Sequence, residues 1–112
     1  EQLARFLEAL VIFTESHSPL LVEVARGDLL HSEQRLKLPH FWQYMTVSVL
    51  LRSAARRGEV DHELDLDYLG EALLAPLEID IFRFQRDVRG YSVERIGSGL
   101  RALVELLGPT EG

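Results

Sequence analysis

Ser16-His17-Ser18 is the stretch of this sequence whose residue types come closest to a catalytic group. Two hydroxyls flank an imidazole, and a hydroxyl beside a general base is the usual starting point of nucleophilic catalysis. A third group must orient the base, and neighbours along a chain rarely supply that geometry. The sequence has no Gly-x-Ser-x-Gly elbow, phosphate-binding loop or paired-carboxylate motif. We therefore expect no catalytic residue and no enzyme activity.

The four histidines, His17, His31, His40 and His62, are the other candidates for chemistry, as metal ligands. No two of them have the i, i+4 spacing of a helical zinc site, and the sequence has no cysteine. We therefore expect no metal site and no cofactor. Histidines on the surface or at helix ends are the favoured interpretation, and His17 is a candidate polar contact for a ligand.

Aromatic and methionine side chains recur at helical spacing, and such side chains line binding sites for small apolar molecules. The same side chains also fill ordinary cores, so both interpretations stay open. Phe41, Trp42 and Met45, which share one predicted central helix, are the favoured centre of a pocket. The candidate ligand-binding residues are Phe13, His17, Phe41, Trp42, Met45, Val49, Tyr68, Ile79 and Phe82.

Length and composition predict one globular domain over residues 1–112, with 46% hydrophobic and 27% charged residues. The net charge of -6 argues against direct binding to a phosphate backbone. No apolar run approaches the roughly 18 residues that span a bilayer, and no signal peptide is visible. We expect a cytoplasmic protein with no membrane partner.

The start of the sequence indicates that more of the protein precedes it. Because "EQLARFLEAL" starts in helical register without an initiator Met, we expect a fragment of a longer protein.

The apolar periodicity predicts an all-α bundle of five helices joined by short connections, which favour antiparallel neighbours. Residues 28–38 are expected to form a loop or one irregular turn. Proline, serine and aspartate mark the predicted starts, and glycine marks the predicted ends. The expected helices cover residues 2–15, Ser18 to Gly27, Pro39 to Gly58, Asp65 to about Val88, and Ser92 to Gly108-Pro109.

The fourth predicted helix carries two opposite apolar faces, and Pro76 predicts a bend within it. One face holds Leu66, Leu69, Leu73, Leu77, Ile81 and Phe84, and the other holds Tyr68, Ala72, Ala75, Ile79 and Phe82. Two apolar faces need two covering elements, and a partner chain is one candidate for the second. Asp80 interrupts the first face, so we expect it to be paired at a dimer seam, with Arg83 as one candidate.

Two glycines inside the fifth predicted helix favour contact with a partner chain. Gly97 lies on the apolar face and Gly99 follows, and each costs the helix about 1 kcal/mol relative to alanine. Such a cost is usually offset where another backbone comes close, although Gly97 packing against the fourth helix is the alternative. The candidate dimer-interface residues are Leu69, Leu73, Leu77, Asp80, Phe84, Ile96, Gly97, Leu100, Val104 and Leu107.

The stretch "AARRGEVDHELDLDYLGEALLAPLEIDIFRF" resembles the C-terminal ligand-binding and dimerisation domain of TetR-family transcriptional regulators. In that family a long helix ends in an Ala-Arg-Gly-Glu-Leu-like turn. An Asp-capped helix with a Gly-Pro-Leu-aromatic-like stretch follows, and one last helix closes the domain. Here the turn is residues 55–60, the cap is Asp65, the Pro-Leu pair is Pro76-Leu77, and the last helix begins at Ser92. The resemblance covers residues 54–107, with departures at Ala75, Glu78, Ile79 and Asp80.

The resemblance implies a homodimer held by a four-helix bundle, to which each subunit contributes its last two helices. It also implies a pocket for a small apolar effector in each subunit. In the family, DNA is bound by a helix-turn-helix that precedes this segment and is absent from this chain. The expected function is therefore the effector-binding and dimerisation domain of a TetR-like repressor. A helical dimerisation or scaffold module with no small-molecule ligand is the alternative.

Overall fold

The computed structural model describes residues 1–27 and 32–109, and all regular structure in those ranges is helical, which confirms the expected all-α class. None of the helices in these ranges is long and apolar enough to cross a membrane. The elements in chain order are α1 (Gln2–Ser16), α2 (Ser18–Gly27), α3 (Ser32–Arg56), α4 (Leu66–Leu74), the 3-10 turn η1 (Ala75–Leu77), α5 (Ile79–Arg83), the π-helical turn η2 (Phe84–Val88) and α6 (Val93–Leu106).

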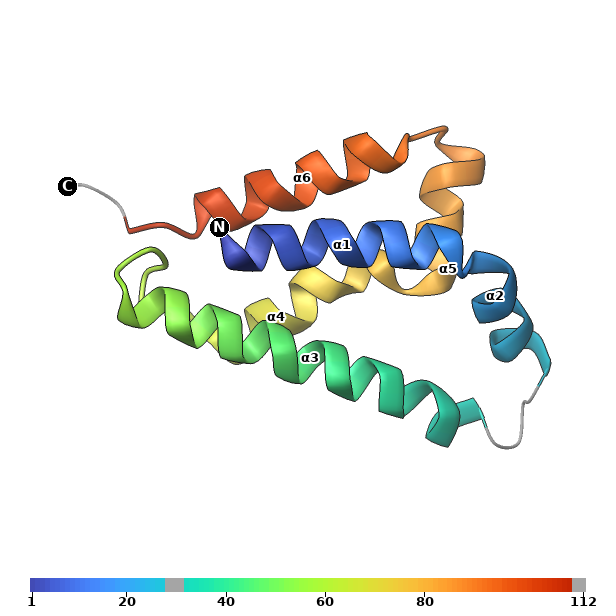
Figure 1. Cartoon of the computed structure of the whole chain (residues 1–112), viewed down its shortest axis with the longest axis horizontal. Helices are drawn as coiled ribbons and strands as arrows, with labels where there is room; N and C mark the ends of the chain where they lie inside the picture. Colours follow the sequence, from blue (N-terminus) through green and yellow to red (C-terminus); the bar gives the residue numbers. More distant parts are fainter. Residues whose placement is uncertain (28–31, 110–112) are drawn as a thin grey trace.

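Helix α1 lies in the middle of the bundle, with α6 along one side and α3 and α4 on the other (Figure 1). Its apolar residues recur every three or four positions, so one side of the helix is buried along its whole length. Leu7 and Val11 are among the most completely buried side chains. The first and last helices of the chain are therefore neighbours, and α1 organises the core.

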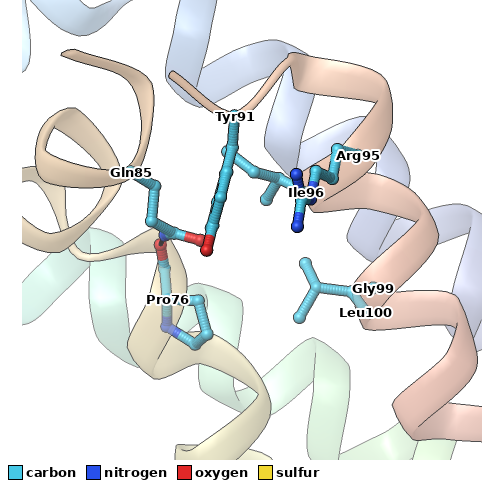
Figure 2. A pocket seen from close by; sticks show the side chains of 7 residues that line it. All are labelled: Pro76, Gln85, Tyr91, Arg95, Ile96, Gly99 and Leu100. Atoms are coloured by element: carbon cyan, nitrogen blue, oxygen red, sulfur yellow. Dashed lines mark hydrogen bonds between the residues drawn. The ribbon is translucent and has the colours of Figure 1, made fainter. Parts of the chain in front are cut away.

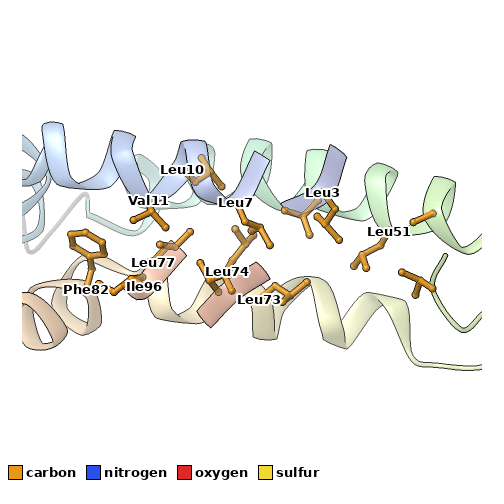
Figure 3. Packing of buried hydrophobic residues seen from close by; sticks show 14 residues of the cluster. Leu3, Leu7, Leu10, Val11, Leu51, Leu73, Leu74, Leu77, Phe82 and Ile96 are labelled. Carbon is orange, nitrogen blue, oxygen red and sulfur yellow. The ribbon is translucent and has the colours of Figure 1, made fainter. Parts of the chain in front are cut away.

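The core joins side chains from α1, α3, α4, η1, α5 and α6 (Figure 3). Phe82 of α5 is its largest fully buried side chain, at 0% exposure. Val47 and Leu51 approach the core from α3, and Ile96 and Leu100 approach it from α6. Burial of an apolar side chain of this size stabilises the fold by about 1.5–3 kcal/mol. This cluster holds the helices in place.

Helix α3 begins at Ser32 rather than at Pro39, so the predicted loop is wrong over residues 32–38. The part of that prediction over residues 28–31 lies outside the described residues. Pro39 was expected at a helix start, where its missing N–H costs nothing. The helix nevertheless continues through Pro39, and it loses one intrahelical hydrogen bond there because proline has no N–H. The predicted end holds, because Gly58 follows α3 with φ 77°.

The fourth predicted helix is broken in the middle. It begins as expected, with the Asp65 carboxylate accepting a hydrogen bond from the Tyr68 backbone N–H at 3.2 Å. The bend predicted at Pro76 is confirmed, but it is a full interruption, because Glu78 is extended at φ -61° and ψ 136°. The Glu78 carboxylate then accepts from the backbone N–H groups of Asp80 and Ile81, both at 3.2 Å. Glu78 therefore caps a new helix, α5.

This interruption exchanges the two apolar faces of the predicted helix. Leu73 and Leu77 are buried, but Ile81 and Phe84, which follow them on the predicted wheel, are exposed. On the opposite face the order is reversed. Its first members, Tyr68, Ala72 and Ala75, are exposed, whereas Ile79 and Phe82 are buried. The prediction of two continuous faces is wrong because one extended residue changes the helical phase.

Candidate functional site

The predicted ligand-binding residues are not gathered in one enclosed cavity in the described structure. Ile79 and Phe82 are core residues, because α5 turns them towards α1. Phe13 and His17 are exposed at the end of α1, where their rings stack at 4.2 Å and His17 Nδ1 lies 3.0 Å from the Phe13 carbonyl oxygen. Tyr68 is exposed on α4. These five residues therefore lie partly in the core and partly on exposed surfaces, and their contact with a ligand stays a prediction.

The other four candidates form one continuous apolar surface, which we call the α3 stripe: Phe41, Trp42, Met45 and Val49. Trp42 is 67% exposed, and its ring meets that of Phe41 edge-on with the centroids 6.0 Å apart. The core-facing side of the same helix carries Val47 and Leu51, roughly opposite the stripe. Exposed aromatic and methionine side chains are typical of surfaces that bind apolar partners or ligands.

A hollow of about 220 Å³ lies elsewhere, between η1, η2 and the first half of α6 (Figure 2). Its walls are apolar, and two polar side chains stand at its edge. Gln85 donates its amide to the Pro76 carbonyl oxygen at 2.9 Å, and the Arg95 guanidinium lies 4.1 Å over the Tyr91 ring. The lining residues are Pro76, Gln85, Tyr91, Arg95, Ile96, Gly99 and Leu100. None of these residues was predicted to contact a ligand.

Most of the predicted dimer-interface residues belong to the core of a single chain. Leu73, Leu77, Ile96 and Leu100 are buried, and Leu69, Val104 and Leu107 pack against the same cluster. A Cβ atom at Gly97 would lie 3.6 Å from the Glu8 side chain, so this glycine packs on α1. These residues were predicted from their apolar spacing, which marks a buried face but does not say which element buries it.

Asp80 and Phe84, the two remaining interface candidates, are exposed on α5 and η2. Asp80 lies in the first turn of α5, where a carboxylate suits the positive end of the helix dipole. The suggested pairing with Arg83 is wrong. Arg83 donates instead to Glu15, at 3.3 Å, and to Asp87.

A second row of small and apolar side chains is left uncovered by the described residues, and we call it the α4–α6 face. On α4 and η1 it consists of Tyr68, Ala72 and Pro76, which are spaced i, i+4 and i+8. On α6 it consists of Gly99, Leu103 and Leu106, which are spaced i, i+4 and i+7. The hollow joins the two rows, because Pro76 and Gly99 both line it. Leu106 is 79% exposed, and a Cβ placed at Gly99 would have no atom within 4 Å other than those of its chain neighbours and its own helix backbone.

The leucine row of this face was visible in the sequence. Leu103 was predicted on the same apolar face of the fifth helix as Leu100, and the spacing of Gly99, Leu103 and Leu106 does not by itself say whether they are buried. Burial of Leu100 and Ile96 against α1 turns this row outwards.

A cluster of ion pairs fixes the end of α1 against η2. The Glu15 carboxylate accepts from Arg86 at 3.0 and 3.1 Å and from Arg83 at 3.3 Å. Arg86 also donates to the Tyr91 carbonyl oxygen at 2.9 Å, and so holds the turn that leads into α6. The hydrogen bond from Arg86 is the main cause that lowers the pKa of Glu15. A second cluster holds α6 on α1, where Arg101 donates to Glu8 at 2.6 Å and to Glu1 at 3.0 Å.

Glu15→Gln is expected to reduce the acid sensitivity of the fold. The pKa of Glu15 is lower in the folded chain than in the unfolded chain. Its contribution to stability is therefore complete above the unfolded-state pKa, and it is lost as the pH falls through the folded-state pKa. Urea unfolding at a series of pH values measures this. Glu23→Gln, at an exposed position on α2, is the matched control. If the two variants lose stability equally between neutral and acid pH, Glu15 has no such role.

Comparisons of this chain with protein-family models, curated proteins and solved structures found no match.

Proposed function

We propose that this chain is the effector-binding and dimerisation domain of a TetR-like transcriptional regulator. In this proposal DNA is bound by residues outside the chain, and the chain pairs two such DNA-binding units. A ligand changes their spacing only if it binds one arrangement of the helices more tightly than another. The resemblance in residues 54–107 supports the proposal, together with the helix order and the capping by Asp65 and Ser92.

The observation that carries the proposal is the α4–α6 face. The resemblance implies a four-helix bundle built from the last two helices of each subunit, and the same two helices expose an uncharged row here. Alanine and glycine in this row allow the backbone of a second helix to approach closely. Leucine and tyrosine supply the apolar area that association requires.

The α3 stripe is the surface that supports the effector half of the proposal. Four large apolar side chains share it, and no charged residue separates Phe41 from Val49 on that side of the helix. Contact with water makes this arrangement unfavourable, so an apolar ligand or a further segment of protein would stabilise it.

The alternative is a helical dimerisation or scaffold module that binds no small molecule. One observation favours it: the candidate ligand residues lie on open surfaces or in the filled core. In the alternative the α3 stripe binds protein only, whereas the α4–α6 face has the same role in both proposals.

Both proposals require the chain to dimerise, and the self-association of the purified chain tests this requirement. We expect sedimentation equilibrium at micromolar concentration to give twice the chain mass of 12.8 kDa. An interface of standard size buries about 800 Å² on each partner, and such interfaces range from micromolar to picomolar affinity. A chain that stays monomeric up to millimolar concentration would contradict the proposal.

A further inference from the structure

The two ends of the α4–α6 face differ in shape. This difference determines the orientation in which a second copy of the chain would fit. The hollow lies at one end, beside the first half of α6, and the exposed leucines lie at the other, in its second half. A volume of about 220 Å³ exceeds the roughly 150 Å³ that holds a benzene-sized group, so the hollow has room for a leucine side chain. One face therefore carries both an open hollow and side chains of a size that fits it.

The charges at the two ends are also opposite. Arg95 stands at the edge of the hollow, where it contacts the Tyr91 ring, and no carboxylate of the described residues forms an ion pair with it. The acidic turn of residues 59–65 lies at the other end of α6, because the Asp61 backbone N–H donates to the Leu107 carbonyl oxygen at 2.9 Å.

Glu63 is the acid of this turn that has no structural role of its own. Asp61 accepts from the Glu63 backbone N–H, and Asp65 caps α4. Glu59 pairs with Arg57 at 3.2 Å. The Glu63 side chain is exposed and has no ion pair within the described part of the chain. Arg95 and Leu107 are about 18 Å apart along α6 at a rise of about 1.5 Å per residue, so the two charges lie at opposite ends of the face.

We infer that a second copy of the chain docks on the α4–α6 face in an antiparallel register. Leu106 of each copy enters the hollow of the other with Leu103 packed beside it, and Glu63 of each copy faces Arg95 of the other. This inference rests on the proposed dimerisation and adds its register. A twofold axis that is perpendicular to α6 and passes between the two copies, level with the turn from Leu100 to Leu103, makes both exchanges at once, because a twofold interface is self-complementary. A parallel register would place Arg95 beside Arg95 and leave both hollows empty.

A charge-exchange experiment tests this register. In the homodimer of Arg95→Glu, the new carboxylate of each copy faces Glu63 of the other. In the homodimer of Glu63→Lys, the new ammonium group of each copy faces Arg95 of the other. Like charges across an interface oppose association, so each variant should self-associate about tenfold more weakly than the unsubstituted chain. An equimolar mixture of the two variants should recover part of the lost affinity, since the mixed dimer joins the new carboxylate to the new ammonium group and keeps one original Glu63–Arg95 contact.

The control is a mixture of Arg95→Glu with Glu23→Lys, whose site on α2 is exposed and away from the α4–α6 face. In this mixture the Glu23→Lys copies should dimerise with each other as the unsubstituted chain does. Its mixed dimer keeps one Glu63–Arg95 contact but opposes Glu63 to the new carboxylate at the other, so it should be weaker than the mixed dimer of Arg95→Glu with Glu63→Lys. If Arg95→Glu with Glu63→Lys fails to recover while the unsubstituted chain is a dimer, the register is wrong and the proposed dimerisation stands. If the unsubstituted chain is itself a monomer at every concentration, both are wrong. Sedimentation of isotopically or fluorescently labelled copies distinguishes mixed dimers from like dimers.

Discussion

Leu106→Glu is expected to weaken self-association of the chain by about 100-fold and to leave the fold of each copy intact. Leu106 is 79% exposed in the single chain, so the new carboxylate is solvated in the monomer. In the proposed dimer the same side chain is buried, and an unpaired charge there costs several kcal/mol. Each 1.4 kcal/mol corresponds to a tenfold change in affinity, so about 3 kcal/mol gives the expected loss.

Leu20→Glu is the matched control for this substitution. Leu20 is also an exposed leucine, at 61%, but it lies on α2, away from the α4–α6 face. We expect it to change neither the sedimentation coefficient nor the melting temperature. Sedimentation velocity over a concentration series, with circular dichroism to verify helix content, makes the comparison. A dimer that survives Leu106→Glu, or that is lost equally with Leu20→Glu, would refute the assignment of this face.

Phe82→Ala is expected to lower the free energy of unfolding by about 3–5 kcal/mol, because it removes an aromatic ring from a packed core and leaves a cavity. Phe82 is 0% exposed and is the largest fully buried side chain among the described residues. Most single domains are stable by only about 5–15 kcal/mol, so this loss is a large share of the total. The urea midpoint should shift accordingly, while the slope of the transition stays the same.

Trp42→Ala gives the complementary result. Both residues were candidates for the same ligand site, but Trp42 is 67% exposed on the α3 stripe. Removal of an exposed side chain usually changes stability by less than about 0.5 kcal/mol. A large loss of stability for Trp42→Ala, or a small one for Phe82→Ala, would contradict the placement of these two side chains.

Local signals in the sequence predicted the ends of the helices well. Asp65 and Ser92 cap α4 and α6 as expected, because a capping side chain bonds to backbone groups only two or three residues away. Gly58 ends its turn with a positive φ for an equally local reason. Pro39 misled the prediction, because a proline favours the first turn of a helix, whereas here the helix continues through it at the cost of one hydrogen bond.

The candidate site was harder to predict, because it depends on contacts between distant parts of the chain. The single extended residue Glu78 rotates α5 relative to the helix that the sequence predicted. Ile81 is therefore exposed, and Phe82 is buried in the core. Gly97 was expected to face a partner chain, but it packs on α1 of its own chain. Of the two glycines in α6, Gly99 is the one whose side is open. Leu100 is only 3% exposed, so a charge there would act on the fold before it acted on any interface.

The pairing of α1 with α6 has a consequence for synthesis of this part of the protein. Arg101 reaches back to Glu1 and Glu8, so α1 is covered by a helix that leaves the ribosome after all the others described here. Until α6 emerges, the side of α1 that it covers remains open to water and to other proteins. Contacts between such distant residues also slow folding, because a loop of about a hundred residues must close before they form. The nascent bundle is therefore most vulnerable to aggregation immediately before α6 is made.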